Sequence, residues 1–173
     1  MDNLAMKSIL SEVKEIDACF LRSNGVEAHG LLAELTRSLS VVSLCYPAFD
    51  MWLSGRVMPG LYSGDRRLLV EARNGVLAGI AIVKDDGLEK KLCCLRVMPK
   101  FQGTGLGLRL FDRAFESLRT EKPLLSVSEE QKPRFERLFE YYGFSVEGVA
   151  IGYYRPKKLE YSVNGLIGSG FGG

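Results

Sequence analysis

KLCCLRVMPKFQGTGLGLRLFDRAFESL, residues 91–118, is the stretch that decides the fold. It contains an apolar strand over residues 91–98, a turn with three glycines, and an amphipathic helix that continues to Leu118. A strand that enters a helix through such a turn directs free backbone N–H groups and the positive end of the helix dipole at one spot. Phosphate oxygens fit that spot, so the stretch predicts a phosphate-binding turn.

The spacing of the glycines distinguishes between known phosphate-binding motifs. A Walker loop ends in Gly-Lys-Ser/Thr, whereas Gly107 is followed here by Leu108 and Arg109. A dinucleotide fingerprint has the pattern G-x-G-x-x-G, and Leu108 occupies the place of its third glycine. Both motifs are therefore excluded.

The segment Leu95-x-Val97-x-Pro99-x-Phe101-Gln102-Gly103-x-Gly105-x-Gly107 closely resembles the acetyl-CoA-binding motif of the GNAT superfamily of N-acetyltransferases. Its core signature is Gln or Arg, two residues, Gly, one residue, and Gly or Ala, which Gln102, Gly105 and Gly107 supply. A second segment, LFEYYGF over residues 138–144, is similar to the family's helix that ends in Gly-Phe. The resemblance extends over roughly residues 16–163.

This resemblance implies an α/β fold with a mixed, mostly antiparallel central sheet and helices on both faces. The sheet is expected to splay between the strand at Leu95–Val97, before the glycine-turn helix, and the strand at Leu124–Val127, after it. We expect a single N-acetyltransferase domain over residues 1–163, followed by a flexible glycine-rich tail over residues 164–173.

The residue patterns also predict the individual elements. The glycine-turn helix is expected to bury a face that includes Leu108 and Phe111. The other predicted elements are a strand at Ile16–Leu21, a helix at Val26–Leu39, a helix from Pro47 that ends at Pro59–Gly60, a hairpin of Arg67–Ala72 and Val76–Val83 turning at Asn74–Gly75, a further turn at Asp85–Asp86–Gly87, a helix from Pro133 that ends at Gly143, and strands at Val146–Arg155 and Leu159–Val163.

The resemblance implies that acetyl-CoA is the cosubstrate, with its pantetheine arm in the splayed gap and its pyrophosphate on the glycine turn. The backbone N–H of Val97 would be the oxyanion donor for the thioester carbonyl. The residues expected to contact acetyl-CoA are Leu95, Arg96, Val97, Gln102, Gly103, Thr104, Gly105, Leu106, Gly107, Leu108 and Phe139.

The acid and the base of the reaction stay open at this point. In many family members a tyrosine protonates the departing thiolate, and Phe139 occupies that position here, where a phenyl ring has no proton to donate. Tyr142 lies one helical turn further and could replace it, or could be a packed aromatic residue. Candidates for the general base are Glu89, the segment Ser128–Glu129–Glu130, and a backbone carbonyl acting through water.

Composition narrows the remaining choices. The 173 residues are 46% hydrophobic and 25% charged with a net charge of +2, which is ordinary for a globular protein and makes a nucleic-acid partner a poor expectation. The four cysteines, Cys19, Cys45, Cys93 and Cys94, have no C-x-x-C spacing, so we expect no metal site and small buried thiols in a reducing compartment. Cys93 and Cys94 should point to opposite faces of their strand. No signal peptide or apolar run of membrane-spanning length is seen, which predicts a cytoplasmic protein.

The sequence as a whole favours an enzyme that moves an acetyl group from acetyl-CoA to a primary amine by direct attack in a ternary complex. One alternative is a regulatory module that binds acyl-CoA with weak or no catalysis. Another is a toxin-like acetyltransferase acting on aminoacyl-tRNA, which the low net charge supports little. The amine acceptor is not identified, and a homodimer through the last two strands is a family-level expectation.

Overall fold

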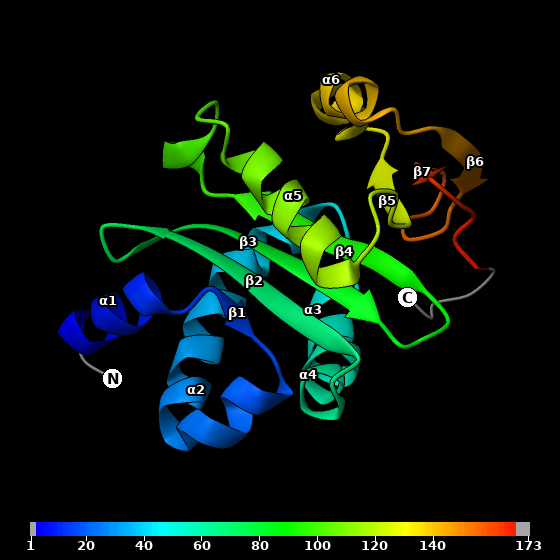
Figure 1. Cartoon of the computed structure of the whole chain (residues 1–173). Coiled ribbons are helices and arrows are strands. Elements are labelled where there is room, and N and C mark those ends of the chain that lie inside the picture. Colours follow the sequence, from blue (N-terminus) through cyan, green and yellow to red (C-terminus); the bar gives the residue numbers. More distant parts are fainter. Residues whose placement is uncertain (1–2, 169–173) are drawn as a thin grey trace.

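The computed structural model describes residues 3–168, arranged as two antiparallel sheets with helices around them (Figure 1). The first sheet has the order β1-β2-β3-β4 and the second the order β5-β7-β6. The expected mixed α/β architecture is confirmed.

The elements are α1 (Asn3–Glu12), β1 (Glu15–Ile16), α2 (Ala18–Leu39), the 3₁₀ helix η1 (Ser40–Leu44), α3 (Phe49–Trp52), the π-helical turn η2 (Leu53–Val57), α4 (Met58–Ser63), β2 (Arg66–Arg73), β3 (Val76–Asp85), β4 (Lys90–Val97), the 3₁₀ turn η3 (Pro99–Phe101), α5 (Leu106–Leu118), β5 (Leu125–Ser128), α6 (Lys132–Tyr142), β6 (Val146–Ile151) and β7 (Leu159–Val163).

Two apolar clusters lie on opposite faces of the first sheet. One face packs against α1, α2 and α4, through residues such as Leu31, Leu35 and Leu61. The other face packs against α5, where Leu110 and Phe111 also contact residues of β5 and α6. Figure 1 shows α5 on one side of β2 and β3 and the N-terminal helices on the other, so the prediction of helices on both faces is confirmed.

The two sheets meet at one point and then separate. The N–H of Leu92 donates to the carbonyl of Leu124 at 2.9 Å, and the N–H of Leu124 donates to the carbonyl of Lys90 at 3.0 Å. This contact is parallel, as expected for strands joined by a helical crossover. Beyond it, β4 pairs with β3 and β5 pairs with β7, so two strand edges face each other across a gap. The predicted splay is confirmed.

The tight turn between β2 and β3 agrees with the sequence, whereas several element boundaries do not. Asn74 and Gly75 both have positive φ, 54° and 69°, which suits a two-residue hairpin turn. The predicted strand at residues 16–21 is wrong, because the carboxylate of Asp17 accepts a hydrogen bond from the N–H of Phe20 at 2.7 Å and starts α2 at Ala18.

Pro59 misled the prediction in the N-terminal half, whereas Gly25 did not. Pro59 stands in the first turn of α4, where a proline costs no hydrogen bond, so the helix continues to Ser63 and ends at Gly64, whose φ is 93°. Gly25, with φ of 40° and ψ of −112°, is not helical and divides α2 by a kink, so the part after the kink agrees with the helix predicted at Val26–Leu39. In α5 the predicted buried Leu108 is 39% exposed, and Leu106 and Leu110 are buried in its place.

The cysteines are less buried than expected, and a β-bulge explains the position of two of them. Val83 pairs with Leu92 and Ile82 pairs with Cys94, so Cys93 is an extra residue in β4. Because the bulge disturbs the alternation of the strand, both Cys93 and Cys94 pack on the side of the N-terminal helices. The prediction of opposite faces is therefore wrong. Cys19 is exposed, and all four thiols are free.

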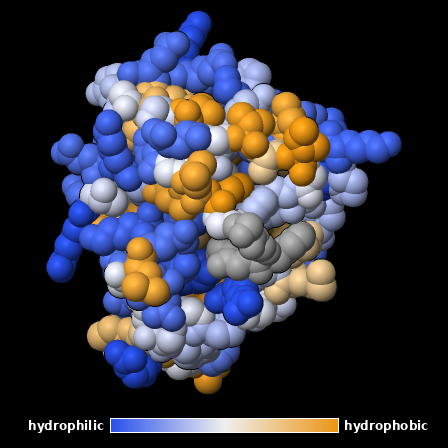
Figure 2. Space-filling model, turned by 90° about the vertical axis from the view of Figure 1, so that its right-hand side faces the viewer, coloured by the Kyte–Doolittle hydropathy of each residue, from blue (hydrophilic) through white to orange (hydrophobic). Residues whose placement is uncertain are grey.

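The edge of the second sheet is formed by β6, which pairs only with β7 among the described strands. Figure 2 views the side of the molecule that carries β6 and β7, and hydrophobic patches stand there among hydrophilic residues. On β6 the exposed apolar side chains are those of Val146, Val149 and Ile151. A homodimer through the last two strands stays a prediction.

The segment after β7 is tied to the second sheet as far as it is described. The N–H of Asn164 donates to the carbonyl of Ser145, and the hydroxyl group of Tyr153 donates to the carbonyl of Gly168 at 2.8 Å. Residues 169–173, the rest of the predicted flexible tail, lie outside the described residues.

Arg113 of α5 connects this helix to the first sheet, and its loss should lower stability. Its guanidinium donates to the buried carboxylate of Glu71 at 2.9 Å, to the carbonyl of Val70 at 2.8 Å and to the carbonyl of Lys14. Replacing Arg113 by leucine leaves Glu71 buried without its close partner, which typically costs about 3–5 kcal/mol. We expect Arg113→Leu to lower the free energy of unfolding in urea by about that amount.

Arg109 provides the matched control for this substitution. Its guanidinium lies 3.9 Å from the Glu71 carboxylate, and its side chain is 57% exposed, against 20% for Arg113. An exposed pair at that distance contributes about 1 kcal/mol or less, so Arg109→Leu should change stability little. Equal losses in the two variants would contradict a role specific to Arg113.

Candidate active site

The gap between the two sheets holds a cavity of about 1210 Å³. Its walls come from the segment between α2 and α4, from β4, from β5 and from α6, so elements far apart in the sequence meet there. The lining includes Val42, Tyr46, Phe49, Trp52, Arg56, Lys91, Cys93, Cys94, Leu95, Arg96, Val97, Pro99, Gln102, Gly107, Ser126, Arg134, Phe135, Leu138 and Tyr154.

One wall of the cavity is the free edge of β4. The N–H of Met98 donates to the carbonyl of Ala78 in β3 at 2.9 Å. Backbone groups of an antiparallel strand alternate in direction, so the N–H and C=O groups of Leu95 and Val97 point away from β3 and toward β5. The carbonyl of Val97 accepts a hydrogen bond from the side-chain amide of Gln102 at 3.3 Å. The strand therefore offers polar backbone groups to a ligand in the gap.

The glycine turn forms one end of the cavity. Gly103 and Gly105 have φ of 76° and 78°, which only glycine adopts readily, and a Cβ atom at either position would meet no atom within 4 Å. Gly105 is the N-cap of α5 and, within the described chain, no side chain caps this helix. The first N–H groups of α5 thus lie uncapped beside open space, which is typical of an anion site.

Most of the predicted acetyl-CoA contacts lie on the cavity wall or in the glycine turn beside it. Five of them line the cavity: Leu95, Arg96, Val97, Gln102 and Gly107. Five more lie in the turn or the first helical turn beside it: Gly103, Thr104, Gly105, Leu106 and Leu108. Their contact with acetyl-CoA stays a prediction.

The two aromatic residues considered for proton transfer lie outside the cavity lining that the structure describes. Phe139 is 6% exposed and stacks on Phe135 and Phe144 inside the second apolar cluster. The hydroxyl group of Tyr142 donates to the carboxylate of Asp112 at 2.6 Å. Burial and this carboxylate raise the pKa of Tyr142 above the usual value for tyrosine. Tyr142 thus binds back to α5, away from the gap.

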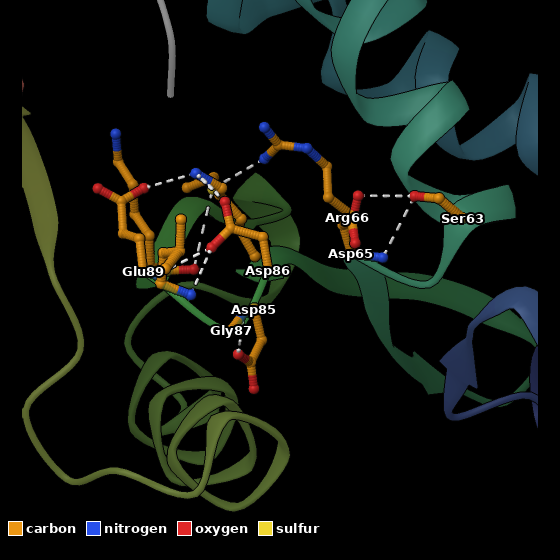
Figure 3. A network of polar contacts seen from close by, with 11 residues as sticks. Ser63, Asp65, Arg66, Asp85, Asp86, Gly87 and Glu89 are labelled. Carbon is orange, nitrogen blue, oxygen red and sulfur yellow. Dashed lines mark hydrogen bonds and ion pairs between the residues drawn. The ribbon is translucent and has the colours of Figure 1, made fainter.

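The acidic residues considered as the general base are engaged in ion pairs at the surface. Glu89 accepts from the ammonium group of Lys84 at 3.0 Å, in a turn network that also contains Asp86 (Figure 3). Glu129 pairs with Lys158 at 2.6 Å. Glu130 accepts from Arg155, and this hydrogen bond lowers the pKa of Glu130 to about 2. A carboxylate held at such a low pKa is a weak base.

A polar group that the sequence analysis missed lies at the other end of the cavity, near the point where the sheets join. Tyr46, Lys91 and Tyr154 line the cavity there, and Lys91 is only 4% exposed. The hydroxyl group of Tyr46 donates to the carboxylate of Glu160 in a long hydrogen bond of 3.3 Å. Glu160 is 3% exposed, and burial raises its pKa above the usual value for glutamate.

The aromatic rings support this polar group. Tyr46 and Tyr154 pack edge to face with ring centroids 5.1 Å apart. Burial raises the pKa of both hydroxyl groups above the usual value, so they remain protonated at neutral pH. The proton of the Tyr46 hydroxyl is committed to Glu160, whereas its oxygen can still accept a hydrogen bond. A tyrosine in this position can pass a proton on only if it receives another.

Residues 3–168 contain no group of three or more His, Cys, Asp and Glu side chains placed to hold a metal ion. None of the helices in this range combines the length and the apolar character needed to span a bilayer.

Comparison with solved structures supports the fold. A protein from Desulfovibrio desulfuricans assigned to the GNAT family of acetyltransferases matches with a TM-score of 0.55 and 19% identity, covering 66% of this chain and 77% of that one. A GNAT family acetyltransferase from Elizabethkingia anophelis, solved with acetyl-CoA bound, matches with a TM-score of 0.51 and 14% identity, covering 62% and 80%. Nourseothricin acetyltransferase matches with a TM-score of 0.51 and 22% identity, covering 58% and 65%.

Comparison by sequence gives the family directly. No match to a curated protein sequence was found. The family model described as acetyltransferase (GNAT) domain matches residues 52–151, more than half of the chain, and this range contains the glycine turn, β4 and α6. The chain belongs to the GNAT family of acetyltransferases.

Proposed function

We propose that the protein transfers the acetyl group of acetyl-CoA to a primary amine by direct attack, with both substrates bound at once. The observation that carries this proposal is the single cavity that extends from the glycine turn to the polar group around Tyr46 and Tyr154. A site of this shape can hold a cosubstrate and an acceptor together, which makes a covalent enzyme intermediate unnecessary.

The residues present fit acetyl-CoA. The open space around Gly103 and Gly105, which any Cβ atom would reduce, accepts the pyrophosphate against the first N–H groups of α5. The outward backbone groups of Leu95 and Val97 suit the amide groups of the pantetheine arm, and the N–H of Val97 is the proposed oxyanion donor. Acetyl-CoA would supply an activated acyl group, whose C–S bond breaks as the new C–N bond forms and whose electron pair leaves on sulfur.

We assign the proton transfer to Tyr46 and Glu160. The attacking amine must lose a proton, and the Tyr46 hydroxyl oxygen can accept it while its own proton passes to the Glu160 carboxylate along their hydrogen bond. A raised pKa makes the Glu160 carboxylate a better base than a surface carboxylate. The hydrogen bond is long, as catalytic hydrogen bonds often are before substrate binds.

No proton transfer is assigned to Tyr142 or Phe139 in this scheme. The Tyr142 hydroxyl is bound to Asp112, and Phe139 has no donor. A thiol has a pKa of about 8.5, so its thiolate can depart without a dedicated acid. Tyr154 packs edge to face on Tyr46 and lines the same cavity, so it helps to hold the Tyr46 ring in place.

A screen with labelled acetyl-CoA tests the proposal. The 173-residue protein is incubated with amino acids, polyamines, aromatic amines and peptides, and labelled products are separated from hydrolysed acetate. We expect at least one amine to be acetylated much faster than the thioester is hydrolysed. Tight acetyl-CoA binding without transfer to any amine would contradict the proposal and favour a regulatory acyl-CoA-binding module.

A further inference from the structure

The charged side chains that line the described cavity all carry positive charge. They are those of Arg56, Lys91, Arg96 and Arg134, and no Asp or Glu stands among the described lining residues. The buried carboxylate of Glu160 lies behind Tyr46 and outside this lining. A lining with four cations favours a ligand that carries an anionic group over one that carries several positive charges only. A polyamine is therefore a poor fit, whereas an amine that also carries an anionic group meets no net repulsion.

Arg96 stands on the side of the cavity away from α5. Along β4 the side chains of Leu95 and Val97 pack in the cluster with α5, whereas Cys94 and Met98 pack in the cluster with the N-terminal helices. Side chains of a strand alternate beyond the bulge, so Arg96 shares the face of Cys94 and Met98. This places its guanidinium beside the wall formed by α3 and its neighbours, apart from the glycine turn.

Arg96 lines the cavity, and its guanidinium is not fully hydrogen-bonded by the protein. Its Nη1 atom is buried and has no hydrogen-bond partner among residues 3–168. A buried donor of a charged group without a partner is costly, and a carboxylate is the group that best matches a guanidinium. The neighbouring wall is apolar and aromatic, with Val42, Phe49 and Trp52 on it.

We propose that the acceptor is an amine with an apolar body and a carboxylate, in which Arg96 binds the carboxylate and the wall around Trp52 holds the apolar body. This inference rests on the proposed acetyl transfer and specifies its substrate class. It differs from the sequence-based expectation that Arg96 contacts acetyl-CoA, and the two can be separated by experiment.

The test compares L-phenylalanine with L-phenylalaninamide, which share an apolar body and an amine and differ in the carboxylate. The measured quantity is the kcat/KM for L-phenylalanine divided by that for L-phenylalaninamide. When this ratio is compared between a variant and the wild type, the difference in intrinsic reactivity between the two amines cancels. A hydrogen-bonded charge pair corresponds to about 10- to 100-fold in binding, so Arg96→Gln should lower the ratio by about that factor. Arg96→Lys should retain part of the preference, since it keeps the charge but not the planar fork.

Arg137→Gln is the matched control, because it removes the same charge from an exposed site on α6 outside the described cavity lining. It should leave the ratio unchanged, and thermal melting should show that all variants are folded. An unchanged ratio in Arg96→Gln, or a rise in the KM for acetyl-CoA in its place, would overturn the inference. Preferred acetylation of spermidine would overturn it and leave the proposed function intact, whereas no transfer to any amine would overturn both.

Discussion

Gly105→Glu is expected to abolish acetyl-CoA binding, raising its Kd by more than about 100-fold. The Cβ position of Gly105 opens into free space at the start of α5, so the new side chain enters the surface on which the pyrophosphate would lie. Two like charges about 4 Å apart repel by roughly 4 kcal/mol near a protein surface, which exceeds a 100-fold effect. Isothermal titration calorimetry with acetyl-CoA measures the loss.

Gly87→Glu separates this charge effect from backbone strain. Gly87 also has a positive φ, 82°, and a Cβ atom there would meet nothing within 4 Å, but it lies in the turn between β3 and β4. Both substitutions force glutamate into a left-handed conformation, which costs about 1–2 kcal/mol. We expect Gly87→Glu to lose stability to a similar extent and to bind acetyl-CoA normally. Normal binding of acetyl-CoA by Gly105→Glu would show that the glycine turn does not hold the pyrophosphate.

The glycine turn could be predicted from the sequence because its determinants are local. The order of strand, glycine turn and helix sets the direction of backbone groups within some twenty residues, and three glycines leave that surface open. The turn at Asn74–Gly75 was predicted correctly for the same reason, since two adjacent residues specify its geometry. Boundaries failed where a capping side chain or the context of a proline decided the outcome, as at Asp17 and Pro59.

The polar end of the cavity could not be predicted, because its residues are joined only by tertiary structure. In LEYSV, residues 159–163, the alternation of apolar and polar residues suggests that Glu160 faces solvent. It is buried because Tyr46, more than a hundred residues earlier, packs against that face of the second sheet. The bulge at Cys93 is equally invisible, since only the register with β3 reveals the extra residue.

Glu160→Gln is the second substitution with a large expected effect, and it should lower kcat by about 10²- to 10⁴-fold, the usual contribution of a general base. Glutamine has the shape of glutamate and can still accept the hydrogen bond of Tyr46, so the cavity keeps its form. Tyr46→Phe should lower kcat as well, because it removes the group that carries the proton to Glu160. Stopped assays with the best amine from the screen measure both, and the KM for acetyl-CoA should stay close to that of the wild type.

The stability of Glu160→Gln distinguishes a general base from a residue kept for structure. If Glu160 is the base, kcat should fall in this variant while its stability rises. Burial is the main cause that raises the pKa of Glu160, and hydrogen bonds from Ser126 and Tyr46 and the charges of Arg155 and Lys91 oppose it only in part. The native state then binds this proton more tightly than the unfolded state, so the ionisation of Glu160 destabilises the wild type as pH rises above the ordinary pKa of glutamate. Glutamine does not ionise, and the advantage of Glu160→Gln in melting temperature should grow from pH 4 towards pH 8.

A variant that is inactive yet at least as stable as the wild type at neutral pH would show that Glu160 is retained for catalysis at a cost in stability, as functional residues often are. Retained kcat would remove Glu160 from the mechanism. A fall in both kcat and melting temperature of Glu160→Gln would mean that the carboxylate of Glu160 has a structural role. In that case the proton must leave the amine by another route.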